Sequence, residues 1–186
     1  MKKLFPFFFI LIWHLPVLSF SQPVMTYWDK EETKKKTEEN FKNGLQHGKF
    51  SQWYSNGQLA RQGNYHEGAE EGEWKKWLDN GKPKSIDFYS KGKLNGKSTV
   101  WHPNGQIAQI SYYKFDQPDS LWQSWFDNGK KKSEESFSAR ETKNNWTSYK
   151  NGKFIYWYSN GNLLSEGTFK MDTMEGKLIS NFDNGK

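Results

Sequence analysis

Large aromatic side chains return along the chain at a fixed interval, with polar residues and turn-forming residues between them. The most regular column is tryptophan, four residues before a glycine, at Trp53, Trp77, Trp101, Trp125 and Trp157. The position after it is mostly aromatic, at Tyr54, Leu78, His102, Phe126, Tyr158 and Phe182. A third column holds Phe50, Trp74, Ser98, Trp122, Phe154 and Leu178. Because side chains alternate faces along a β-strand, the tryptophan column points one way and the other two columns point the opposite way.

The dipeptide Asn-Gly marks the period of this pattern. Its glycines follow one another at steps of 24, 24, 24, 32 and 24 residues, at Gly57, Gly81, Gly105, Gly129, Gly161 and Gly185. The long step contains an eight-residue insertion, which we place within about residues 138–148. The segment Lys34–Phe41 matches Lys130–Phe137 almost residue for residue, so six units of about 24 residues fill residues 34–186. Such self-similarity is typical of a repeat architecture.

Each unit contains two strand-length segments. One follows Asn-Gly and ends in an aromatic residue, and the other runs from a second glycine, such as Gly72, to the next Asn-Gly. Asn-Gly favours a two-residue hairpin turn, whereas we expect the Gly-rich link from Gly68 to Gly72 to form a longer connection.

Stacking these hairpins in register predicts an all-β fold, an elongated antiparallel meander with aromatic ladders along it. A single-layer sheet of this kind leaves one aromatic column partly exposed.

The chain begins with the pattern of a secretory signal peptide, residues 1–21. Lys2 and Lys3 precede an apolar run over residues 4–18, and Ser19 and Ser21 supply small residues at the expected cleavage site. A retained membrane anchor is the alternative, but the run is short for a bilayer span of about 20 residues. No later stretch is apolar enough to cross a membrane, so we expect no membrane span after removal of the signal. Residues 22–33 read as a linker, in which Tyr27 and Trp28 are candidates for packing on the first repeat.

Charge and cysteine usage narrow the possible partners. The formal net charge is +6, from 27 basic and 21 acidic residues, and removal of Lys2 and Lys3 leaves 25 against 21, or +4. The two signs are interspersed and no reader motif is present, which argues against nucleic-acid binding. The chain has 0 Cys, which excludes disulfides, thiolate metal sites and a lipidated cysteine.

Residues capable of catalysis or metal binding are scattered. His47, His66 and His102 occupy three different columns without a metal-ligand spacing, and no nucleophile motif occurs. We therefore predict no enzymatic activity, no metal and no cofactor.

The repeat resembles a known family in its motifs. The strings Trp53–Leu59, Gly68–Trp74 and Trp157–Leu163 (WYSNGQL, GAEEGEW and WYSNGNL) are similar to the MORN repeat variant of bacterial proteins, and the resemblance covers residues 34–186. Members of this type are often labelled antitoxins of the YwqK kind, and this resemblance implies binding to another protein. The fourth unit departs from the pattern because Asp116–Ser120 replaces its two link glycines, so we expect that turn to differ.

These features predict an exported, non-enzymatic protein-binding module or scaffold of the cell envelope, in the periplasm, on the outer-membrane surface or outside the cell. An antitoxin-like or immunity-like role belongs to this reading. The alternative is a ligand platform in which Trp53, Trp77, Trp101, Trp125 and Trp157 bind cell-wall glycan, choline-like groups or lipid head groups. A purely structural role for the same tryptophans is also open. We expect the insertion around Ala139–Trp146 to form a loop that carries individual specificity.

Overall fold

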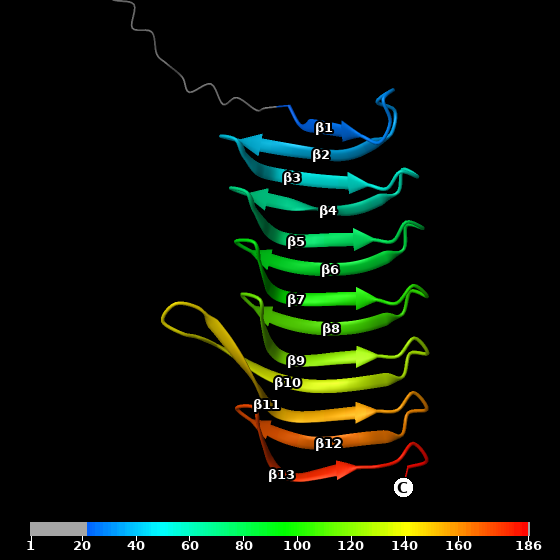
Figure 1. Ribbon diagram of the computed structural model, residues 1–186, viewed down its shortest axis with the longest axis vertical. Coiled ribbons are helices and arrows are strands. Elements are labelled where there is room, and N and C mark those ends of the chain that lie inside the picture. The colour runs from blue at the N-terminus through cyan, green and yellow to red at the C-terminus, as the bar shows by residue number, and fades with distance from the viewer. Residues whose placement is uncertain (1–21, 186) are drawn as a thin grey trace, which may run out of the picture.

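The computed structural model describes residues 22–185, which form one antiparallel sheet of 13 strands in sequence order (Figure 1). The predicted signal peptide, residues 1–21, lies outside the described residues. The strands are β1 Val24–Tyr27, β2 Lys35–Lys42, β3 Leu45–Trp53, β4 Leu59–His66, β5 Ala69–Trp77, β6 Pro83–Ser90, β7 Lys93–Trp101, β8 Ile107–Lys114, β9 Gln117–Trp125, β10 Lys131–Glu141, β11 Trp146–Trp157, β12 Leu163–Lys170 and β13 Thr173–Ser180. The fold is therefore the predicted all-β open meander.

The segment predicted as a linker contributes a strand of its own. β1 pairs antiparallel with β2, and the chain then turns through a loop closed by Asp29, whose carboxylate accepts the backbone N–H groups of Thr33 and Lys34. The indole N–H of Trp28 donates to the carbonyl of Trp53 at 3.0 Å. Trp28 thus packs on the first repeat, as the sequence suggested.

The two kinds of turn are exchanged relative to our expectation. Asn56-Gly57 lies in a five-residue loop, Tyr54–Gln58, in which the N–H of Gly57 donates to the carbonyl of Tyr54 at 2.9 Å. The two-residue turns are at the other ends of the strands, for example at Glu67-Gly68, where both residues have positive φ and His66 pairs with Ala69. Positive φ at both positions is the requirement of the tight hairpin turn, so the Gly-rich link forms it and Asn-Gly does not.

The unit without link glycines keeps the same backbone. Phe115 and Asp116 have φ of 46° and 70°, and Ser120 has φ of 58°. Our expectation that this turn would differ is therefore wrong. Asp116 offsets the lost glycine with a hydrogen bond, because its carboxylate accepts the N–H of Leu94 at 2.8 Å.

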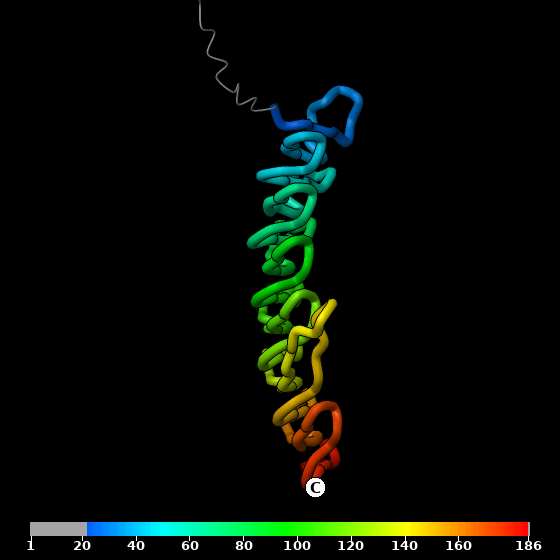
Figure 2. Tube along the Cα trace, turned by 90° about the vertical axis from the view of Figure 1, so that its left-hand side faces the viewer, coloured from blue at the N-terminus to red at the C-terminus, as the bar shows by residue number. Residues whose placement is uncertain are grey.

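The second glycine of each unit bends its strand. Gly72 has φ of 72° within β5, and the pairing with β4 shifts register between Gln62 and Asn64. An extra residue on one strand of a pair bends that strand and increases its twist. The two-residue turns accordingly curve away from the plane of the sheet and lie above one another along the long axis (Figures 1 and 2).

The two faces of the sheet differ in burial. We call the face that carries the Phe50 column the inner face and the face that carries the tryptophan column the outer face. The buried hydrophobic residues are Phe50, Trp74 and Phe154, at 7, 0 and 5 % exposure, and all are on the inner face. All five predicted tryptophans are half-buried on the outer face. One aromatic column is thus partly exposed, as the single layer required.

Hydrogen bonds run from each unit to the next at the five-residue loops. The side chain of Asn56 accepts the N–H of Gln58 and donates to the carbonyl of Asp79 at 2.7 Å, and Asn104, Asn128 and Asn160 make the same pair of contacts. Tyr54 likewise donates its hydroxyl to the carbonyl of Trp77. These asparagine side chains therefore stabilise their own loop and join it to the loop of the next unit.

The eight-residue insertion is a longer hairpin and not a loop. β10 and β11 continue pairing through Ser138 with Tyr149 and on to Glu141 with Trp146, and a short turn closes at residues 142–145. Figure 1 shows this extended hairpin leaving the sheet and leaning toward β8 and β9. We call residues 138–149 the arm.

Candidate functional site

The predicted tryptophan ladder is in place, but two of its five rings already have a lysine ammonium against them. The ammonium of Lys35 lies 5.6 Å from the ring centroid of Trp53, and Lys131 lies 5.9 Å from that of Trp157. These are cation–π contacts made by the chain itself. They reduce the ring area that a quaternary ammonium ligand needs.

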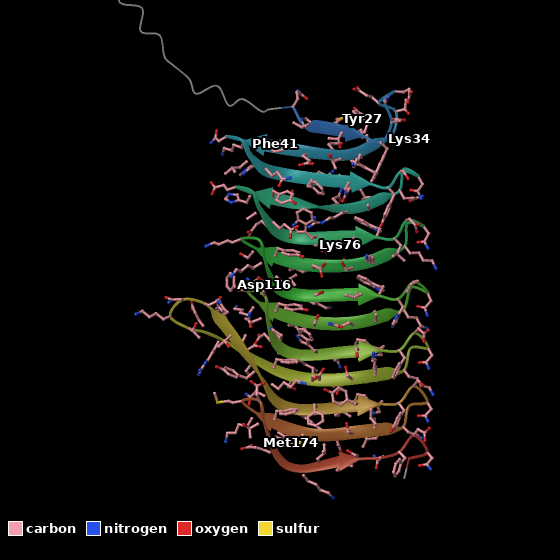
Figure 3. All side chains as sticks on the ribbon, in the orientation of Figure 1. Tyr27, Lys34, Phe41, Lys76, Asp116 and Met174 are labelled. Atoms are coloured by element: carbon pink, nitrogen blue, oxygen red, sulfur yellow. The ribbon has the colours of Figure 1, made fainter. Side chains whose placement is uncertain are left out.

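Two separate cavities have Trp53 in their linings. The first has a volume of about 300 Å³ and is lined by Trp28, Gln52, Trp53, Tyr54, Ala60, Arg61, Lys76, Trp77 and Lys84. The second has a volume of about 690 Å³ and is lined by Thr33, Lys34, Lys35, Trp53, Ser55, Asn56 and Gly57. The first cavity lies beside inner-face residues such as Arg61 and Lys76, which pair with each other across β4 and β5, and we call this cavity the N-terminal groove. Figure 3 labels Lys34, beyond β1, and Lys76, on β5.

Large apolar side chains gather on the outer face in the middle of the array. Phe88, Tyr112 and Leu121, from β6, β8 and β9, are 38, 37 and 40 % exposed. Phe88 is paired across strands with Glu73, and Tyr112 with Lys97. Exposed apolar residues with charged neighbours, here on β6, β8 and β9, are typical of a docking surface. We call these three residues the outer patch. The repeat pattern does not indicate it, because the residues in the two columns that supply it vary from unit to unit.

On the inner face a polar cluster interrupts the aromatic stack. The Asp87 carboxylate accepts hydrogen bonds from the hydroxyl groups of Ser98 at 2.6 Å and Ser85 at 2.9 Å, and Lys76 lies 3.3 Å from it. Ser111 is buried beside this cluster at 1 % exposure. Because each polar group has a partner, the cluster fixes the pairing of β6 and β7 without opening a cavity.

Three tyrosines next to the core have perturbed ionisation. Burial raises the pKa of Tyr89 and Tyr113 above the usual value of 10.0. Burial also raises the pKa of Tyr156, and the hydrogen bond that its hydroxyl donates to the Glu135 carboxylate at 2.6 Å adds to that rise. All three therefore stay protonated at neutral pH.

The arm is held against the preceding two-residue turn. The ring of Trp146 lies 5.5 Å from that of Phe115 at 31°, with the Lys114 ammonium 5.7 Å from the indole. The backbone N–H of Ala139 donates to the Asp119 carboxylate at 2.9 Å. The surface that the arm presents is therefore set by packing on β8 and β9.

The histidines come closer together than their columns suggested. The rings of His47 and His66 lie across β3 and β4 with centroids 5.0 Å apart and tilted by 48°, whereas His102 hydrogen-bonds to the carbonyl of Trp125. Within residues 22–185 no group of three or more His, Asp or Glu side chains is arranged to hold a metal ion. The same residues contain no helix long and apolar enough to cross a membrane.

Comparison with known proteins identifies the repeat. The family model of the MORN repeat variant matches residues 46–67, 70–91, 94–115, 118–139 and 150–171, which together make up more than half of the chain. Each match covers one five-residue Asn-Gly loop and the two strands that it joins, and the gap between the last two matches falls on the arm. The curated proteins compared with the sequence give no significant match.

Proposed function

The chain belongs to the MORN repeat variant family, and on that premise we propose that it is a non-enzymatic protein-binding module. The observation that carries this proposal is the outer patch. Phe88, Tyr112 and Leu121 expose apolar area on a face that no second layer covers within residues 22–185. The regular sheet supplies a fixed platform, and such platforms bind partners without moving their backbone.

The proposal also concerns the cellular location of the protein and its biological role. The N-terminal pattern of Lys2, Lys3, the apolar run and Ser21 supports export. We propose that the module works in the cell envelope or outside the cell, and that its partner is a protein which it neutralises or anchors. An antitoxin-like role fits an exported chain only if its target is also outside the cytosol.

The ligand-platform alternative has weaker support. The tryptophans are half-exposed, as a platform requires, but Lys35 and Lys131 already lie against two of the rings. A choline-like cation would have to displace these ammonium groups from the indole faces, at an electrostatic cost. Protein binding through the outer patch requires no such displacement.

The test is affinity capture from envelope and culture-supernatant fractions with the tagged, exported chain. We expect a protein retained at stoichiometric level after salt washing, and we expect the triple variant Phe88→Ser, Tyr112→Ser, Leu121→Ser to lose it. The matched control is Asn64→Ser, Thr168→Ser, because both residues are exposed in the same row of the outer face. Circular dichroism must first show that all variants fold alike. Equal capture by the triple variant and the control would refute the outer patch as the binding surface.

A further inference from the structure

Two histidine side chains face each other across β3 and β4. Gly48 of β3 is paired with Tyr65 of β4. The same register, continued by one residue, places His47 opposite His66, and the two rings lie against each other. Strand pairing therefore brings together two potential metal ligands whose separation in the sequence gave no ligand motif.

The distance between the two rings is that of two imidazoles on one metal ion. A metal bound at about 2.1 Å to one nitrogen of each ring lies about 3.2 Å from each ring centroid. The two centroids are then about 4.5 Å apart for a right angle at the metal and about 5.2 Å apart for a tetrahedral angle. The centroids of His47 and His66 are 5.0 Å apart, within this range.

The environment of the rings leaves nitrogen atoms available to a metal. The Nδ1 atom of His47 is buried and has no hydrogen-bond partner within residues 22–185. A buried polar atom without a partner is uncommon, and an unmodelled ion is one of its ordinary explanations. His66 is exposed, so an ion can reach the pair from solvent. Neutral imidazole is the commonest metal ligand among protein side chains.

From this geometry we propose that His47 and His66 together bind a divalent transition-metal ion, with Cu²⁺ bound more tightly than Ni²⁺ or Zn²⁺. Imidazole nitrogen suits all three ions, and Cu²⁺ stands highest in the general order of affinity. Ca²⁺ and Mg²⁺ require oxygen ligands, which this pair does not offer. Within residues 22–185 no third His, Asp or Glu side chain joins the pair, so water completes the coordination and the ion remains exchangeable.

The metal site would join two strands near the N-terminal end of the sheet. An ion held by one ligand from β3 and one from β4 binds the folded chain in preference to the unfolded chain, and it therefore stabilises this hairpin. The site is separate from the outer patch, which lies on β6, β8 and β9. The inference consequently goes beyond the proposed protein-binding function and does not depend on it.

The experiment titrates Cu²⁺ into the full exported chain, purified with a tag that contains no histidine. The buffer contains glycine, which competes for weak sites such as the terminal amine. We expect one Cu²⁺ per chain, with affinity reduced at least about tenfold in His66→Asn because one of two protein ligands is lost. The matched control is His102→Asn, which removes a histidine outside the pair and should bind like the wild type. Circular dichroism must show that both variants fold.

Electron paramagnetic resonance gives a second readout that does not depend on affinity. The spectrum of the wild type should show two imidazole nitrogens bound to Cu²⁺, and that of His66→Asn should not. Equal affinity of His66→Asn and the wild type would overturn the inference, as would an equal loss in His102→Asn or a wild-type spectrum without two imidazole nitrogens. None of these results touches the proposed function, because that proposal depends on capture of a protein through the outer patch.

Discussion

Gly63 lies against the indole of Trp74, the most completely buried side chain of the array. A Cβ atom on Gly63 would overlap three ring carbons, of which even the most distant, Cε3, would be 2.7 Å away. Gly167 has the same relationship to Phe154, with ring carbons at 2.8 and 2.9 Å. The inner face is thus built by placing the largest side chains beside the smallest.

Gly63→Ala should lower the free energy of unfolding by about 3 kcal/mol, because Trp74 is enclosed and overpacking in cores costs about 1–3 kcal/mol or more. Denaturant unfolding measures the change. Gly57→Ala is the control, since no atom lies within 4 Å of the added methyl group and only its φ of 85° is unfavourable. We expect about 1–2 kcal/mol there. A smaller loss for Gly63→Ala than for Gly57→Ala would contradict this packing.

Asp87 and Ser98 should behave as a coupled pair. Asp87 stands beside Ser98 in β6 and β7 as Gly63 stands beside Trp74 in β4 and β5. Ser98→Trp alone would press a large ring on a buried carboxylate, and Asp87→Gly alone would leave hydroxyl groups and Lys76 without their partner.

Each single substitution should therefore destabilise by about 2–4 kcal/mol. The double variant, which copies the Gly–Trp arrangement of the neighbouring unit, should recover at least half of the summed loss. A double-mutant cycle followed by denaturant unfolding measures the coupling. If the losses in unfolding free energy were additive, Asp87 and Ser98 would be energetically independent.

Asp116 tests how a turn survives without glycine. Asp116→Gly removes the hydrogen bond to Leu94 but relaxes the positive φ, so we expect a change below about 1 kcal/mol. Asp116→Ala removes the same bond and keeps the strain, which should cost about 2 kcal/mol. Thermal unfolding of both variants decides the matter, and equal stabilities would show that the hydrogen bond has little effect.

Alkaline pH should destabilise the array. The raised pKa of Tyr89, Tyr113 and Tyr156 means that the unfolded chain loses these protons first, near pH 10. Their contribution to stability is complete below that pH and falls as pH rises above it. Tyr156→Phe should reduce the slope of unfolding free energy against pH between about 9 and 11. An unchanged slope would show that Tyr156 does not contribute to it.

The arm depends on Trp146 for its position. Trp146→Ala removes the contact with Phe115, so limited trypsin digestion at Arg140 and Lys143 should become faster while the global unfolding midpoint changes little. Lys132→Ala, an exposed change outside the arm, serves as the control. Deletion of residues 139–146 that left capture of the partner intact would remove the arm from any account of specificity.

The aromatic and glycine columns of the sequence predicted the strands, because the alternation of side chains between faces and the constant repeat period independently indicate the same segments. Strands β2 to β13 are those expected from Asn-Gly and tryptophan spacing. β1 was missed, since Val24–Tyr27 has no counterpart in the repeat and becomes a strand only because the edge of β2 is available. The sequence of a four-residue segment does not by itself indicate that the segment will pair with a neighbouring strand.

The prediction assigned the two kinds of turn to the wrong places, because the turn preference of the Asn-Gly dipeptide does not decide where strand pairing closes. Asn-Gly suits a two-residue turn, but Glu67-Gly68 and Lys91-Gly92 stand at the positions where pairing closes, and both carry positive φ. Counting residues between the two alternating segments would have identified them. The relation of Gly63 to Trp74 was also readable, as a glycine in mid-strand across from an aromatic column. The outer patch and the N-terminal groove were not, because they combine residues from different columns, with Trp28 contributed by a segment outside the repeat.

The hydrogen bonds of the Asn and Tyr columns reach only the adjacent unit. The strands of residues 22–185 also pair only with their neighbours in sequence, and closing such short loops carries a low entropic cost. Folding of this array can spread outward from whichever hairpin forms first, and opening can proceed inward from either end. The N-terminal groove lies at one of those ends, where Trp28 joins β1 to Trp53. The backbone amide protons of the strands around the N-terminal groove should exchange before those of the central strands. A ligand that holds Trp28 in place would therefore slow the opening of the sheet from its N-terminal end.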